Sequence, residues 1–133
     1  VGECRGGEAL DMLQAMNTGH DGSLTTLHAN SPEDVIDRMV TMVRYAVDLP
    51  VDAIEAQIGN AFDYVVQVSR HGSGARFLSA VAVVAYDRSR RACAVERIYE
   101  SGGPGEGHWL RRPEPLEGPE GGIAEEGAAA WAA

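Results

Sequence analysis

The hydrophobic pattern of this chain of 133 residues changes its period at Phe62. Before Phe62, apolar residues recur every three to four positions, as they do on the buried face of an α-helix. From Phe62 to Tyr99, apolar and polar residues alternate, as they do in strands with one buried face. The chain is therefore predicted to contain helices before Phe62, alternating with short strands, and neighbouring strands after it; strands and helices that alternate in this way are typical of an α/β protein.

The expected element order is strand, helix, strand, helix, helix and then a β-meander. This order indicates a parallel core that antiparallel strands extend. The first predicted strand ends at residues 1–2. The other predicted strands cover residues 23–29, 62–70, 76–86 and 92–99. The first predicted helix covers residues 8–17, the second begins at Ser31, and the third begins at Pro50.

Two of the helix boundaries have clear sequence signals. Gly19 follows the first predicted helix and is typical of a C-terminal stop. Before the second helix, Ser31 supplies a capping hydroxyl and Pro32 suits the first turn. Glu33 and Asp34 then place negative charge at the positive end of the helix dipole.

Two turns separate the three strands of the predicted meander. The sequence His-Gly-Ser-Gly at residues 71–74 is a hairpin signal, because its glycines reach backbone conformations that other residues avoid. The polar run at residues 87–91 separates the second strand from the third. Both turns join neighbours in sequence, so the pattern predicts an antiparallel meander.

Composition changes sharply near Glu100. Residues 101–133 contain half of the 16 glycines and four of the 6 prolines, with few apolar residues. Such a segment cannot bury enough apolar surface to offset the entropy cost of ordering the chain. We therefore expect a folded domain at residues 1–100 and a disordered acidic tail at residues 101–133. Trp109 and Trp131 are candidate docking anchors in this tail, although isolated aromatic residues in such tails more often have no role.

The overall charge excludes some classes of partner. The chain has 20 acidic and 11 basic residues, a net charge of −9, which argues against nonspecific binding to nucleic acid or to an anionic membrane. All the basic residues are arginine, so the chain cannot by itself supply a P-loop lysine or a Schiff base. The longest nearly apolar run, 77–86, is too short to span a membrane. Cys4 and Cys93 lie far apart, which predicts reduced thiols.

An acid and an imidazole follow two of the predicted strands. Glu3 follows the first strand and His28 ends the strand at residues 23–29. Because ligands bind at the carboxyl ends of strands in open α/β sheets, we expect these two side chains to share a site. Glu3 suits the holding of a Mg²⁺-bound water or an attacking water in phosphoryl transfer, and His28 suits a hydrogen bond to a terminal phosphate. Thr26, on the same strand face, adds a hydroxyl.

Each of these residues also has an ordinary structural explanation. Glu3 is close enough in sequence to form an ion pair with Arg5, and a single histidine such as His28 is often a structural residue. A zinc site formed by Cys4, His20 and His28 is a further alternative, although their spacing matches no known zinc motif.

The sequence VGECRGGEALDMLQAMNTGHDGSLTTLHAN, residues 1–30, resembles the Walker B and His boxes of the type II/IV secretion and pilus-assembly ATPase superfamily. Its run from Gly6 to Ser23 and its ending His-Ala-Asn are most similar to the Tad/Flp pilus-assembly branch, which is close to the conjugative type IV secretion ATPases. The sequence LPVDAIEAQIGNAFDYVVQVSR, residues 49–70, resembles the same branch. The resemblance covers about residues 1–100.

The resemblance implies the C-terminal part of a RecA-like P-loop ATPase domain. The whole protein would be a cytoplasmic homo-hexamer at the inner face of the cell membrane, using ATP and Mg²⁺ to drive pilus assembly or secretion together with inner-membrane platform proteins. Glu3 matches the Walker B glutamate, which acts on Mg²⁺ through its water, and Arg5 matches the arginine of the same box. His20 and His28 match the two histidines of the His box, with His28 near the terminal phosphate and Thr26 in support.

The chain also departs from the pattern of this superfamily. The Walker A loop with its lysine, the Asp box and the N-terminal domain would lie before Val1, so we expect this chain alone to be inactive. Cys4 stands where the family usually has an aliphatic residue, and an acidic tail such as residues 101–133 is not a general family feature. Two alternatives remain open: a noncatalytic interaction module or degenerate subunit of such a machine, and a metal-dependent hydrolase.

Overall fold

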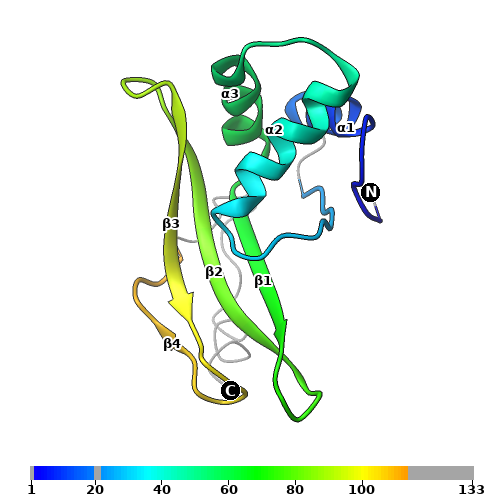
Figure 1. Ribbon diagram of the computed structural model, residues 1–133. Helices are drawn as coiled ribbons and strands as arrows, with labels where there is room; N and C mark the ends of the chain where they lie inside the picture. The colour runs from blue at the N-terminus through cyan, green and yellow to red at the C-terminus, as the bar shows by residue number, and fades with distance from the viewer. Residues whose placement is uncertain (1, 20–21, 114–133) are drawn as a thin grey trace.

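The structure is a computed structural model that describes residues 2–19 and 22–113. Within them, three helices lie toward one end of a four-stranded sheet (Figure 1). The helices are α1 (Ala9–Asn17), α2 (Asp34–Ala46) and α3 (Val51–Ala61). The strands are β1 (Tyr64–Arg70), β2 (Arg76–Asp87), β3 (Ala92–Glu100) and β4 (His108–Trp109). This combination of helices and sheet confirms the predicted α/β class.

The sheet is the predicted meander with one further strand. Its order is β1-β2-β3-β4, and every neighbouring pair is antiparallel. The turn between β1 and β2 is closed by the His71 N–H, which donates to the Ala75 carbonyl oxygen at 2.8 Å. Gly74 in that turn has φ +88°, a left-handed conformation that glycine adopts without strain.

The predicted strand at residues 23–29 is wrong in the described part of the chain. This segment is extended and is assigned to no strand; the Cys4 N–H donates to the Thr26 carbonyl oxygen at 2.8 Å. A parallel strand requires a regular ladder of such bonds. The described residues therefore contain no parallel pair, and the expected parallel core is absent from them.

The helix boundaries follow the sequence signals closely. The Ser31 hydroxyl accepts a hydrogen bond from the Asp34 N–H at 3.2 Å, as expected for a capping residue. The helix itself begins at Asp34, slightly later than predicted. Gly19, after α1, has φ +91°, which fits its predicted place at the helix end. Pro50 precedes the first residue of α3, as the sequence predicts.

The helix α3 connects the two layers of the fold. It packs against β2 and β3 on one side and against α1 and α2 on the other. The side chains of Met39, Val43, Ile54 and Ile58 form the centre of this core and are almost fully buried. Gly59 lies so close to β2 that an added Cβ would be 2.7 Å from the Cβ of Tyr86 and 2.8 Å from its backbone nitrogen. The helix can approach the sheet this closely because the residue at this position has no side chain.

The start of the predicted tail is ordered, which corrects the expected boundary at Glu100. Residues 108–109 pair with β3, and the Leu110 N–H donates to the Ile98 carbonyl oxygen at 2.8 Å. The rings of Trp109 and Tyr99 meet edge to face with centroids 5.1 Å apart. This aromatic contact and the added strand offset the cost of ordering a glycine-rich segment. Residues 114–133, including Trp131, lie outside the described part of the chain.

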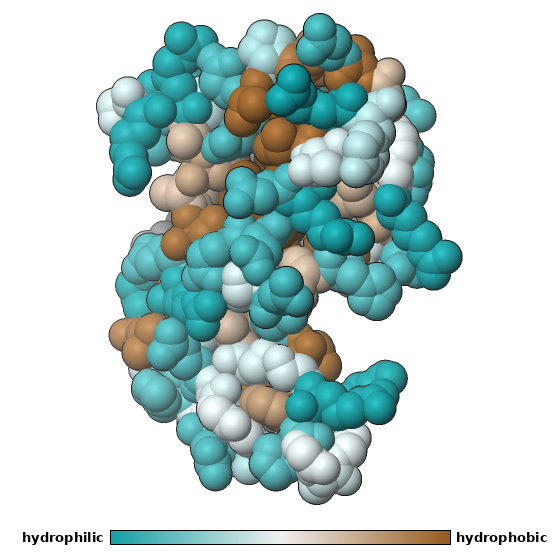
Figure 2. Space-filling model, viewed as in Figure 1, coloured by the Kyte–Doolittle hydropathy of each residue, from teal (hydrophilic) through white to brown (hydrophobic). Residues whose placement is uncertain are grey.

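The surface of the described residues is mainly hydrophilic. Figure 2 shows this surface, with hydrophobic residues gathered over the helical end. Among these residues, no helix has the length and apolar character needed to cross a membrane. Cys4 and Cys93 are free thiols, as predicted. Burial raises the pKa of the Cys93 thiol to about 11, so this thiol is protonated at neutral pH.

Candidate functional site

Two extended segments, residues 2–5 and 24–28, hold the candidate site. The Cys4 N–H donates to the Thr26 carbonyl oxygen at 2.8 Å, and the Thr26 hydroxyl donates to the Gly2 carbonyl oxygen at 2.6 Å. These two bonds fix the segments side by side. As a result, Glu3 Oε1 lies 3.0 Å from His28 Nε2. The structure therefore brings together the acid and the imidazole that the sequence places at neighbouring strand ends, and it gives Thr26 a positioning contact.

Glu3 is held as a carboxylate by its neighbours. The Arg5 guanidinium donates to Glu3 Oε2 at 2.6 Å, and this hydrogen bond lowers the pKa of Glu3 below its ordinary value. The charge of His28, when protonated, acts in the same direction. The ion pair with Arg5 is the structural role that the sequence left open for Glu3, and it accounts for one of the two carboxylate oxygens.

The other oxygen of Glu3 is not accounted for within the described residues. Oε1 has no solvent contact and no hydrogen bond of good geometry, although His28 Nε2 is nearby. An inaccessible carboxylate oxygen without a hydrogen bond is costly. The Glu3 side chain as a whole is 26% exposed and ionised, so its carboxylate suits a hydrogen bond from a water bound to Mg²⁺, which is the indirect metal contact that the resemblance implies.

Glu8 also organises this site, and the sequence analysis did not identify that role. Its Oε1 accepts hydrogen bonds from the backbone N–H groups of Arg5 at 2.7 Å and Gly6 at 3.1 Å. The bond from the Arg5 N–H is the main reason that the pKa of Glu8 is lowered. Glu8 thereby fixes the turn that carries Arg5 toward Glu3. Glu8 makes no side-chain cap bond to α1, so the sequence preferences for helix caps do not reveal this contact.

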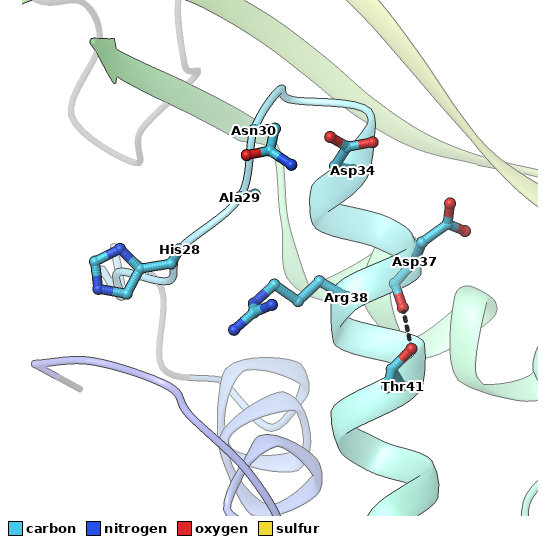
Figure 3. A pocket seen from close by; sticks show the side chains of 7 residues that line it. All are labelled: His28, Ala29, Asn30, Asp34, Asp37, Arg38 and Thr41. Atoms are coloured by element: carbon cyan, nitrogen blue, oxygen red, sulfur yellow. Dashed lines mark hydrogen bonds between the residues drawn. The ribbon is translucent and has the colours of Figure 1, made fainter. Parts of the chain in front are cut away.

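His28 lies at the rim of an open hollow of about 550 Å³ (Figure 3). The His28 side chain is 86% exposed, so it is accessible to a ligand. The hollow is lined by His28, Ala29, Asn30, Asp34, Asp37, Arg38 and Thr41. Four of these residues come from α2, and the sequence analysis did not connect that helix with the site. The spacing of the apolar residues in α2 identifies the buried face of this helix, but it does not show which residues lie beside the exposed face.

The described residues give no support to the zinc alternative. Among them, no group of three His, Cys, Asp or Glu side chains could hold a metal ion. Cys4 is buried in the core, and this burial raises the pKa of its thiol and disfavours the thiolate that zinc requires. His20, which was predicted to belong both to this alternative and to the nucleotide site, lies outside the described residues.

Residues 1–97 match the protein family described as "Type II/IV secretion system protein". A protein of Mycobacterium tuberculosis described as a conjugal transfer protein is 39% identical over 63% of this chain and 24% of its own length. The conjugal transfer protein TrbB of Rhizobium radiobacter is 35% identical over 65% of this chain and 26% of its own length. The chain thus spans about a quarter of the length of these curated relatives.

A solved structure is also similar to this chain. It is the VirB11 ATPase from the Brucella suis type IV secretion system, in complex with sulphate. The similarity has a TM-score of 0.56 with 36% sequence identity, and it covers 62% of this chain and 26% of the other. Part of this chain therefore has a counterpart in a protein of known structure.

Proposed function

The chain belongs to the type II/IV secretion system protein family, and from this premise we propose that it forms part of the ATP-hydrolysing centre of a secretion or pilus-assembly motor. The observation that carries the proposal is the contact between Glu3 and His28. An ionised carboxylate with one unsatisfied oxygen lies 3.0 Å from an accessible imidazole. Phosphoryl transfer requires little covalent chemistry from the protein and depends on groups that position water and stabilise charge.

In this proposal each residue of the site has one task. Glu3 orients water through its carboxylate group, while Arg5 donates to Oε2 and keeps Glu3 ionised. His28 donates a hydrogen bond to the terminal phosphate of ATP, and Thr26 fixes the segment that carries it. His20 is a second histidine of the same box. Mg²⁺, when bound through water, neutralises the negative charge of the phosphates.

The remainder of the motor belongs to the proposal as well. The domain at residues 1–100 would complete a RecA-like fold with a P-loop that supplies the lysine this chain lacks. The assembled protein would be a homo-hexamer on the cytoplasmic face of the inner membrane, in contact with platform proteins, and its cargo would be a pilus of the Tad/Flp type or a secreted substrate. What supports these points is the resemblance of residues 1–30 and 49–70 to the Tad/Flp branch.

The first test is to read the source DNA upstream of the Val1 codon. We expect a strand followed by G-x-x-x-x-G-K-[ST], with an acidic box before Val1. In the protein expressed with that segment, Glu3→Gln and His28→Ala should abolish ATP turnover and leave nucleotide binding largely intact. Glu96→Gln and His71→Ala, which alter an acid and a histidine elsewhere on the surface, are the matched controls and should retain turnover.

The chain of 133 residues alone should show no measurable ATP hydrolysis. Its missing phosphate-cradling amides and lysine supply much of the nucleotide binding in P-loop enzymes. Turnover by this chain that disappears in Glu3→Gln would contradict this expectation.

A noncatalytic interaction module is the second candidate, and the exposed apolar face of β1 favours it. Val66 and Val68 point to the same side of this edge strand and are largely exposed. Exposed apolar side chains on an edge strand are typical of surfaces that pack against another part of an assembly. If an upstream P-loop is absent, or if Glu3→Gln and His28→Ala turn over ATP normally, this second function becomes the better one.

A further inference from the structure

Arg38 lies near two acids but, unlike several other arginines, forms no ion pair with a carboxylate among the described residues. Arg5, Arg91, Arg97 and Arg111 each form an ion pair with a carboxylate. In the described part of the chain, Arg38 forms no ion pair or hydrogen bond through its side chain, although it lines the same hollow as Asp34 and Asp37. These two acids lie in the first turn of α2, where the helix dipole already stabilises them.

The direction of the Arg38 side chain is visible in Figure 3. It extends from α2 toward the side of the hollow on which His28 lies. The carboxylates of Asp34 and Asp37 lie on the other side of the view, away from the guanidinium. The Arg38 guanidinium therefore lies on the side of the hollow where His28 is, and the two acids lie on the other side.

A guanidinium and an imidazole that line the same open hollow are both able to donate hydrogen bonds to an anion. The planar guanidinium of arginine matches the oxygens of a phosphate group with two parallel hydrogen bonds. Such a pair is notable in a chain with a net charge of −9 and no lysine, because the protein as a whole repels anions.

We propose that Arg38 is a second phosphate-binding residue of the site, which contacts phosphate oxygens of the bound nucleotide together with His28. This inference rests on the proposed function for the identity of the nucleotide. The two extended segments were already expected to contact the phosphate groups, and Arg38 adds a contact from α2. A bound phosphate would therefore connect α2 to residues 24–28.

The test uses the chain of 133 residues and inorganic pyrophosphate as the probe. Pyrophosphate is titrated at constant ionic strength, and binding is followed by calorimetry and by the NMR signals of the His28 ring. Arg38→Gln should weaken binding about tenfold, the loss expected for a charge-assisted contact. Arg38→Lys should retain part of the affinity, because lysine keeps the charge and loses the paired geometry.

Arg44→Gln is the matched control, because Arg44 lies on the same helix and does not line the hollow. It should change the affinity less than twofold. An equal weakening in Arg38→Gln and Arg44→Gln would mean general electrostatic attraction and would overturn the inference, as would a wild-type chain whose His28 signals do not respond to millimolar pyrophosphate. Circular dichroism of each variant shows that the fold is retained.

The failure of this inference differs from a failure of the proposed function. If Glu3→Gln abolishes turnover in the longer protein while Arg38→Gln leaves pyrophosphate binding unchanged, the ATPase function stands and the role of Arg38 is wrong. If Arg38→Gln weakens pyrophosphate binding while Glu3→Gln turns over normally, the anion site stands and the ATPase function is wrong.

Discussion

The extended segments 2–5 and 24–28 and the helical core are built in different ways. The segments are held side by side by the Cys4–Thr26 and Thr26–Gly2 hydrogen bonds, and although Cys4 is buried, Leu24 is 84% exposed and His28 86% exposed. The core is formed by regular elements whose side chains are excluded from water, such as Ile58 at 0% exposure. Folding stability and the candidate chemistry thus reside in separate regions, and mutations should affect one without the other.

The largest separation should appear between Ile58→Ala and Leu24→Ala. Removing the buried Ile58 side chain leaves a cavity between α3 and its neighbours, so the free energy of unfolding should fall by about 3 kcal/mol. Leu24→Ala should change it by less than about 0.5 kcal/mol, because the leucine is already in water. Urea denaturation of both variants measures the difference, and equal losses would show that the segment belongs to the core.

The close approach of α3 to β2 can be broken with one methyl group. Gly59→Ala would place a Cβ against the backbone of Tyr86, and we expect a loss of about 2 kcal/mol from this overpacking. Alanine would otherwise favour the helix by up to about 1 kcal/mol, so the sign of the effect tests the contact. The control is Gly72→Ala, where an added Cβ meets open space. A more stable Gly59→Ala variant would show that the helix can move away from the sheet.

The ion pair between Glu33 and Arg97 ties the start of α2 to β3 and should give the core a specific acid sensitivity. Two hydrogen bonds of 2.7 and 2.8 Å join the side chains, and the bonds from Arg97 lower the pKa of Glu33 from 4.5 to about 2. Since the folded-state pKa is depressed, the stabilisation is complete above pH 4.5 and is lost as the pH falls toward 2.

Glu33→Gln should therefore flatten the acid limb of the plot of stability against pH and change little at pH 7 beyond the loss of a partly exposed ion pair. Arg97→Gln should flatten it similarly, because it removes the main cause of the lowered pKa. Thermal unfolding from pH 2 to pH 7 measures both effects. An acid limb identical to that of the wild type in both variants would exclude this pair as its source.

The smallest effect on stability should come from Glu3→Gln, the variant with the largest expected effect on turnover. Its ion pair with Arg5 lies at the surface, where the arginine is mostly exposed, so the unfolding midpoint at pH 7 should not change measurably. Differential scanning calorimetry of Glu3→Gln and Ile58→Ala compares the unfolding midpoints of the two variants. A large drop in the midpoint would mean that Glu3 has a structural role and would remove the contrast between the two regions.

The sequence by itself determined the local elements of this protein. The change of period at Phe62, the cap at Ser31, and the stop at Gly19 depend on residues close in sequence, and the structure reproduces them within a few residues. The sequence also placed Glu3 and His28 at adjacent ends of extended segments. The reason is that capping, turn geometry and periodicity act over a few residues, which a linear pattern records directly.

Tertiary structure alone decided which elements pair and which side chains meet. The segment at residues 23–29 has strand-like composition but lacks a ladder of partners, while residues 108–109 became a strand because β3 and Tyr99 were available to them. Tertiary structure also decided that Arg38 and His28 line one hollow and that Gly59 lies against Tyr86. A periodic pattern states that a face is buried but does not name what covers it, because the covering residues come from distant parts of the chain.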